Sequence, residues 1–110
     1  MNSPSERQLT YIENLKKSYL DRQEGQYIGI GTVQHKMMCI VNYALTLALP
    51  APQTTAEASE QIDALKYGMM DYARRHQEWS QPVLARIAEL FGDGGENRPD
   101  DWEGVKSALA

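Results

Sequence analysis

The sequence has few of the residues from which disulfides and metal sites are built. Its 110 residues include one cysteine and two histidines. The single cysteine, Cys39, excludes a disulfide within the chain, so the fold must be held by packing, and a reducing, cytoplasmic setting is expected. His35 and Cys39 are four residues apart, which is a zinc-ligand spacing, but no second pair completes a tetrahedral site. We therefore expect neither a metal nor another cofactor.

Excess positive charge and long apolar runs are also lacking. Residues 1–50 carry five basic and four acidic side chains, residues 51–110 carry six and eleven, and the net charge is −4. Proteins that bind nucleic-acid backbones usually need clustered Lys or Arg, so this acidic chain is not typical of them. The most apolar run, residues 37–49, is interrupted by Asn42 and Thr46 and is too short to span a membrane. The first residues show no apolar signal-peptide segment.

The glycine-rich segment 25-GQYIGIGTVQHK-36 contains only part of a phosphate-binding motif. A dinucleotide fingerprint needs GxGxxG between a strand and a helix, but Gln34 stands where the third glycine should be. The Gly-Lys-Ser/Thr ending of a Walker loop is absent as well. We interpret the segment as a chain reversal between two helices, in which Thr32 caps the second helix.

Apolar residues recur at helical spacing through most of the chain, which predicts a single all-α domain of four or five helices. Ser3, Pro4 and Glu6 provide an N-cap, a first-turn proline and a capping box for the first helix. For the later helices we expect Thr54 or Thr55 and Asp100 as N-caps, and Gly92 as a C-cap. The second helix is apolar nearly all round and should be the central one. Its polar stripe of His35, Asn42 and Thr46 is expected to face solvent; the alternative is a buried polar seam that needs hydrogen-bond partners. The predicted helices span residues 4–22, 33–49, 55–79, 81–91 and 100–109.

The predicted helix over residues 55–79 carries a heptad seam. Its positions are separated by alternating steps of three and four residues: Thr55, Ala58, Ile62, Leu65, Met69, Tyr72, His76 and Trp79. A helix of about 25 residues is about 37 Å long. Such a seam must pack against most of the other helices or against a second copy, so a homodimer through this helix is one expectation. Gly68 within it predicts a close approach or a kink.

No combination of residues predicts an active site, and we expect a non-enzymatic protein that binds another protein. Aromatic and arginine side chains cluster near residue 76, and this composition is typical of interaction hot spots. The alternative is that Tyr72 and Trp79 belong to the core, with His76 hydrogen-bonded at its edge. Trp102 is expected to lie over the core as a lid. The candidate interaction residues are Tyr72, Arg74, Arg75, His76, Trp79, Asp100, Asp101 and Trp102.

The competing hypothesis is a nucleic-acid accessory protein. It would use the two basic doublets of the chain, Lys16-Lys17 and Arg74-Arg75. Binding would then weaken steeply as salt is added, because cations are released from the phosphate backbone.

Two segments together resemble a small helical module of actinobacterial and phage proteins. Residues 5-SERQLTYIENL-15 are similar to its opening, T-E-K-Q-x-x-Y-I-x-x-L, and residues 55-TAEASEQIDAL-65 to its closing helix, T-K-x-E-A-S-x-x-I-D-x-L. The helix between them is longer than is usual in the module, and everything after Met69 lies outside the match. The module has no catalytic residues. The resemblance implies a small accessory or interaction domain, encoded by a phage or mobile element, for example an inhibitor of a host defence protein.

Overall fold

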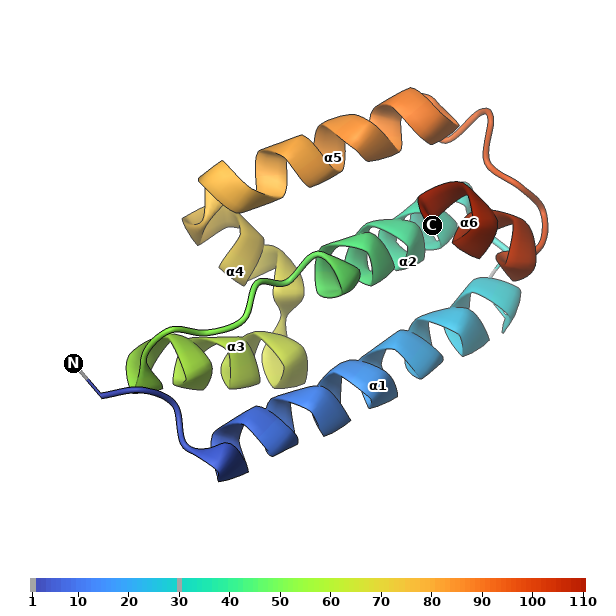
Figure 1. Ribbon diagram of the computed structural model, residues 1–110. Helices are drawn as coiled ribbons and strands as arrows, with labels where there is room; N and C mark the ends of the chain where they lie inside the picture. Colours follow the sequence, from blue (N-terminus) through green and yellow to red (C-terminus); the bar gives the residue numbers. More distant parts are fainter. Residues whose placement is uncertain (1, 30) are drawn as a thin grey trace.

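The protein is an elongated bundle of helices, about 45 × 26 × 22 Å, seen here as a computed structural model that describes residues 2–29 and 31–110 (Figure 1). Six helices and no strands occur in these residues, which confirms the predicted all-α bundle. The helices are α1 (Glu6–Gly29), α2 (Val33–Leu47), α3 (Thr55–Tyr67), α4 (Met69–Arg75), α5 (Gln77–Phe91) and α6 (Trp102–Leu109). Over the described residues, none of them is both long and apolar enough to cross a bilayer.

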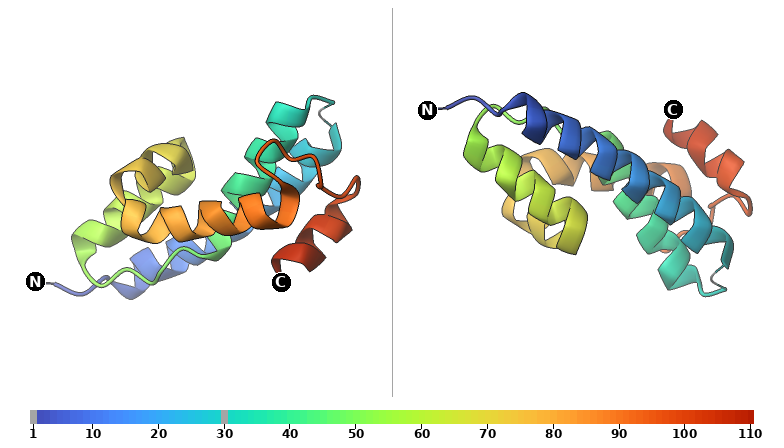
Figure 2. Two further views of the ribbon diagram at one scale, coloured as in Figure 1. Left: turned by 90° about the horizontal axis from the view of Figure 1, so that it is seen from above. Right: turned by 90° about the horizontal axis from the view of Figure 1, so that it is seen from below.

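The first helix, α1, runs along most of the long axis of the molecule, and α2 returns beside it (Figures 1 and 2). α3 packs on the first half of α1, α5 lies on the opposite side of α2, and α6 covers the far end (Figure 1). The two segments that resemble the helical module therefore lie side by side in α1 and α3. Their apolar residues Ile12, Ala58 and Leu65 are buried in one cluster.

Helix starts follow the capping rules, with two corrections to the predicted residues. Thr32 and Thr54 cap α2 and α3 as expected, because their hydroxyls accept bonds from the backbone N–H groups three residues on. α1 is capped by Ser5 instead of Ser3: Ser5 Oγ accepts from Gln8 N at 3.1 Å, and Gln8 Oε1 accepts from Ser5 N at 3.2 Å. α6 is capped by Asp101 instead of Asp100.

The first helix is longer than the 4–22 that was predicted, because tertiary packing outweighs the helix-breaking tendency of its glycines. Tyr27 is 1% exposed, and its hydroxyl donates to Pro99 O at 2.5 Å. Lys36 Nζ donates to Tyr27 O at 2.7 Å and so satisfies a carbonyl in the last turn. A helical glycine costs about 1 kcal/mol relative to alanine, less than burial of a tyrosine returns. Gly25 and Gly29 therefore belong to α1 and not to a chain reversal as predicted; Ile30 lies outside the described residues.

The single helix expected over 55–79 is divided into α3, α4 and the start of α5. Gly68 ends α3, and His76 lies between α4 and α5 with φ −128° and ψ 57°. His76 Nε2 is 2.9 Å from Glu60 Oε2, although a straight helix would hold these residues about 24 Å apart. α5 consequently starts at Gln77, four residues before the predicted start at residue 81, and Pro82 lies inside it instead of in its first turn.

The middle of the heptad seam nonetheless faces inward, although Thr55 at its start is exposed and His76 near its end is only partly buried. Ala58, Leu65, Met69 and Tyr72 are buried in the cluster that joins α1, α2, α3 and α4. Because this seam is covered by the chain's own helices, it does not offer the dimer surface that was predicted for one long helix. A second buried cluster joins α1, α2, α5 and α6 at the other end: Tyr27, Cys39, Ile40, Ala44, Ile87, Phe91, Trp102 and Val105.

The polar stripe on α2 does not face solvent as a whole, so that prediction is wrong. His35 is exposed, but Thr46 is fully buried and its hydroxyl donates to Asn42 O at 2.7 Å. Asn42 Oδ1 is buried with no hydrogen-bond partner among the described residues. The threonine is tolerated in the core because the preceding turn of its own helix satisfies the hydroxyl.

Gly95, in the loop before α6, is predicted to be the glycine least tolerant of a side chain. It is buried with φ 75°, and an added Cβ would come within 2.4 Å of the Met37 sulfur. Gly95→Ala should lower the free energy of unfolding by about 1–2 kcal/mol, since alanine is strained in the left-handed region. Gly94→Ala is the control, because its Cβ would meet only the flexible Glu96 carboxylate at 3.3 Å. Equal urea midpoints for the two variants would contradict this account.

Candidate functional site

The candidate interaction residues predicted from sequence fall into two groups at opposite ends of the molecule. Tyr72, Arg74, Arg75, His76 and Trp79 form the α4–α5 corner, whereas Asp100, Asp101 and Trp102 belong to the start of α6 (Figure 1). They do not form one continuous surface.

Most polar groups of the α4–α5 corner are used within the fold. The Tyr72 ring is buried, with its centroid 4.3 Å from that of His76 and 5.6 Å from that of Trp79. Trp79 Nε1 donates to Ala48 O at 2.8 Å. Burial is the main cause that raises the pKa of the Tyr72 hydroxyl above its ordinary value. This arrangement agrees with the alternative in which Tyr72 and Trp79 are core residues with His76 at its edge.

The basic residues of the corner are paired with carboxylates. Arg74 Nη1 lies 2.8 Å from Asp71 Oδ1, and Arg75 Nη1 lies 3.6 Å from Glu60 Oε2. Both arginine side chains remain more than half exposed, so these pairs add little stability. They do, however, place negative charge beside each guanidinium, which reduces the attraction of this corner for phosphate.

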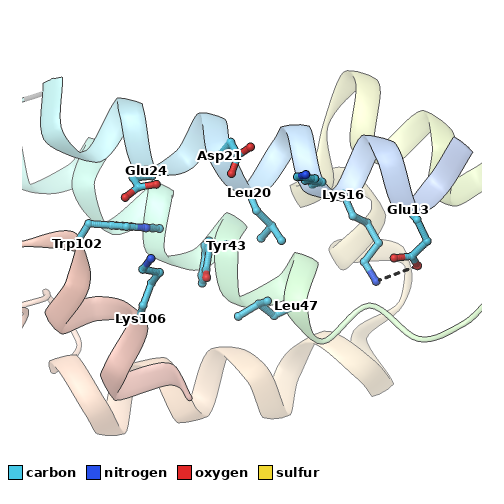
Figure 3. Close-up of a pocket in the computed structure, with 10 residues that line it drawn as sticks. Glu13, Lys16, Leu20, Asp21, Glu24, Tyr43, Leu47, Trp102 and Lys106 are labelled. Atoms are coloured by element: carbon cyan, nitrogen blue, oxygen red, sulfur yellow. Dashed lines mark ion pairs between the residues drawn. The ribbon is translucent and has the colours of Figure 1, made fainter. Parts of the chain in front are cut away.

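A second surface, which sequence reasoning did not identify, is an open groove of about 390 Å³ between α1, α2 and α6 (Figure 3). Leu20 points from α1 toward Tyr43 and Leu47 of α2, and the Trp102 ring extends from α6 beside them (Figure 3). We call this the α1–α2–α6 groove. Its remaining lining residues are charged: Glu13, Lys16, Lys17, Asp21, Glu24 and Lys106.

Trp102 is both a core residue and part of the groove wall. It is 3% exposed and its ring centroid lies 5.0 Å from that of Tyr27 and 4.9 Å from that of Tyr43, which it meets edge-on. This confirms the lid over the core. Among the described residues, the Trp102 indole N–H has no hydrogen-bond partner, unlike that of Trp79.

Leu47 is the most exposed apolar residue of the groove. Its side chain is 49% exposed at the end of α2, and on its other side it borders a smaller apolar groove of about 240 Å³ with Val83, Ile87 and Leu109. The sequence signal was the nearly all-round apolar character of α2. That pattern predicted that α2 would be buried on all sides, but the neighbouring helices leave this part of α2 uncovered.

The lysines of the groove differ in their partners. Lys16 Nζ lies 3.8 Å from Glu13 Oε1 and Lys106 Nζ lies 3.1 Å from Glu103 Oε1. The Glu103 carboxylate, which accepts a hydrogen bond from Lys106, raises the pKa of that ammonium group. Lys17 has no ion-pair partner within residues 2–29 and 31–110, so it is the lysine of the groove best placed to meet an added carboxylate.

Histidine and cysteine do not converge on a metal site. Cys39 is buried whereas His35, one turn earlier, is exposed. Burial raises the pKa of the Cys39 thiol, with Lys36 acting in the opposite direction, and a protonated thiol is a poor ligand and nucleophile. In the part of the chain that the structure describes, no three His, Cys, Asp or Glu side chains are close enough to hold a metal ion.

Comparison of this chain with protein-family models, with curated proteins and with solved structures found no match. The fold and its surfaces define an all-α bundle with a mixed apolar and charged groove between α1, α2 and α6.

Proposed function

We propose that this chain acts without catalysis, by binding another protein in the α1–α2–α6 groove. The observation that carries the proposal is the half-exposed Leu47 beside Tyr43 and the Trp102 ring, surrounded by charged side chains. An apolar and aromatic centre within a polar rim is the usual anatomy of a protein interface. Aromatic residues at such a centre also tend to carry most of the binding energy.

The phage-borne origin implied by the sequence resemblance indicates which partners to screen first. A protein of the bacterial host, for example a defence protein that this chain would inhibit, is the first choice. A second copy of the chain is the other partner to include, since the groove carries charges of both signs.

The test compares two exposed apolar positions, one in the groove and one outside it. Leu47→Glu places a charge at the groove centre, and Tyr67→Glu, at a residue 77% exposed at the end of α3, is the matched control. Each immobilised variant is offered an actinobacterial lysate and a differently tagged copy of the wild-type chain. Every retained protein is identified, purified and measured by calorimetry.

We expect the wild type and Tyr67→Glu to bind the same purified partner, and Leu47→Glu to bind it at least about tenfold more weakly, a loss of about 1.4 kcal/mol. Retention by all three proteins alike would place the interface elsewhere. Retention of nothing by the wild type would contradict the proposal.

The nucleic-acid hypothesis is tested alongside. Three of its four basic residues, Lys16, Arg74 and Arg75, already face carboxylates within 4 Å. We therefore expect no change in the anisotropy of a labelled DNA duplex or RNA strand at 50 mM salt. A salt-sensitive signal that Lys17→Glu abolishes would favour nucleic acid instead.

A further inference from the structure

Most of the charges that α1 contributes to the α1–α2–α6 groove are segregated along the helix. Lys16 and its neighbour Lys17 precede Leu20 in the chain, whereas Asp21 and Glu24 follow it; Figure 3 shows Lys16, Leu20, Asp21 and Glu24 in this order. The exception is Glu13, which precedes the lysines and pairs with Lys16. Lys16 and Glu24 are each four residues from Leu20, so they lie about 6 Å along the axis on either side of it. With Glu13 included, the groove-facing side of α1 carries a net charge of +1 before Leu20 and −2 after it.

Such a face is complementary in charge to a second copy of itself that runs in the opposite direction. A second α1 laid antiparallel, with a two-fold axis through Leu20, places Lys16 of each copy opposite Glu24 of the other. Lys17 then lies next to Asp21 and Glu24 of the second copy. A parallel arrangement would instead place like charges together, which is unfavourable. Two-fold symmetry repeats every favourable pair.

The groove is also shaped to accept the helix that borders it, α1, from a second copy. α1 forms one edge, so the α1 ridge of each copy can enter the groove of the other, as ridges pack into grooves between helices. Leu20 and Leu47 would then be covered, together with the groove-facing edge of Trp102. The half-exposed Leu47 would no longer face water.

The total charge of the groove also favours a second copy of the chain over other partners. Three lysines and three carboxylates line it, Lys16, Lys17 and Lys106 against Glu13, Asp21 and Glu24, which sum to zero. A nucleic acid or a strongly acidic or basic peptide gains nothing from such a surface. A partner that carries positive and negative side chains in the reversed order forms a favourable charge pair at each position.

We propose that the occupant of the α1–α2–α6 groove is a second copy of this chain, in an antiparallel dimer about Leu20. The inference rests on the proposed function in one respect, that this groove is a protein-binding surface. It replaces the dimer through residues 55–79, whose seam is buried within the chain's own core.

The test is a charge exchange followed by mixing. The basic-reversed variant is Lys16→Glu with Lys17→Glu, and the acid-reversed variant is Asp21→Lys with Glu24→Lys. Light scattering at tens of micromolar should give the wild type twice the chain mass of 12.4 kDa. Each variant alone should be monomeric, with at least about tenfold weaker self-association. An equimolar mixture of the two should regain the dimer mass, because opposite charges then face one another.

Arg7→Glu with Glu89→Lys is the control, since both residues are exposed and line neither wall of the groove. It should remain dimeric. Circular dichroism checks that every variant is helical, and recovery on mixing is itself evidence that both reversed chains are folded.

The outcomes separate this inference from the proposed function. A wild type that stays monomeric up to millimolar concentration, or reversed variants that dimerise as it does, would overturn the self-pairing. If a monomeric wild type still binds a host protein and Leu47→Glu does not, the groove remains a binding surface for a different partner. If the chain dimerises and neither reversal changes its mass, the groove is not the interface.

Discussion

Replacing Trp102 with alanine is expected to lower the free energy of unfolding by about 3–5 kcal/mol, the usual cost of removing a buried aromatic side chain. The indole is 3% exposed and lies between the Tyr27 and Tyr43 rings. It also holds α6 against α1 and α2. Its removal opens a cavity in the second buried cluster and frees the last helix from the bundle.

Urea unfolding followed by circular dichroism measures this change, and Trp102→Phe is the control. Phenylalanine keeps an aromatic ring against both tyrosines, so we expect it to lose less than half as much. A Trp102→Ala variant within about 1 kcal/mol of the wild type would mean that α6 is not part of the cooperative core.

Replacing Tyr72 with alanine is expected to cost a similar amount, about 3–5 kcal/mol. Its ring is buried under Trp79 and His76 at the α4–α5 corner. This result separates the two interpretations of the corner that the sequence left open. A core residue costs stability when it is truncated, whereas an exposed interaction residue costs affinity and leaves stability nearly unchanged.

The matched control is Tyr72→Phe, which keeps the buried ring and removes only its hydroxyl. We expect that variant to lose less than half as much stability as Tyr72→Ala. If Tyr72→Ala left the urea midpoint unchanged, the corner would be a loosely packed surface, and the hot-spot interpretation would regain its support.

The fold was largely predictable because it depends on local signals. Capping residues and apolar spacing located the starts of α2 and α3 and the C-terminal glycine of α5, Gly92. The failures occurred where distant contacts override local preference. α1 continues through Gly25 because Tyr27 is buried under α6. The helix over 55–79 breaks at Gly68 and His76, and α4 turns back so that Met69 and Tyr72 are buried in the cluster with α1 and α2.

The candidate site was harder to predict, because a groove depends on which side chains the neighbours leave uncovered. Leu20, Tyr43 and Leu47 follow the same apolar pattern as core residues, and nothing in their spacing marks them as exposed. Trp102 was noticed for its residue type, but its neighbours became clear only when α6 was placed beside α1. The charge order of Lys16, Lys17, Asp21 and Glu24 was visible in the sequence, yet its meaning depends on their lying in one groove.

The central claim is that the α1–α2–α6 groove is the contact surface between two copies of this chain, and the two tryptophans of the sequence provide its most direct test. Trp102 lines the groove, whereas the Trp79 indole N–H is bonded to Ala48 O at the α4–α5 corner. The measurement is the pair of indole ¹⁵N–¹H resonances over a dilution series from millimolar to micromolar, with Trp102→Phe for assignment. We predict that the Trp102 resonance shifts with concentration and that of Trp79 does not. A moving Trp79 signal beside a fixed Trp102 signal, or two fixed signals, would contradict the account.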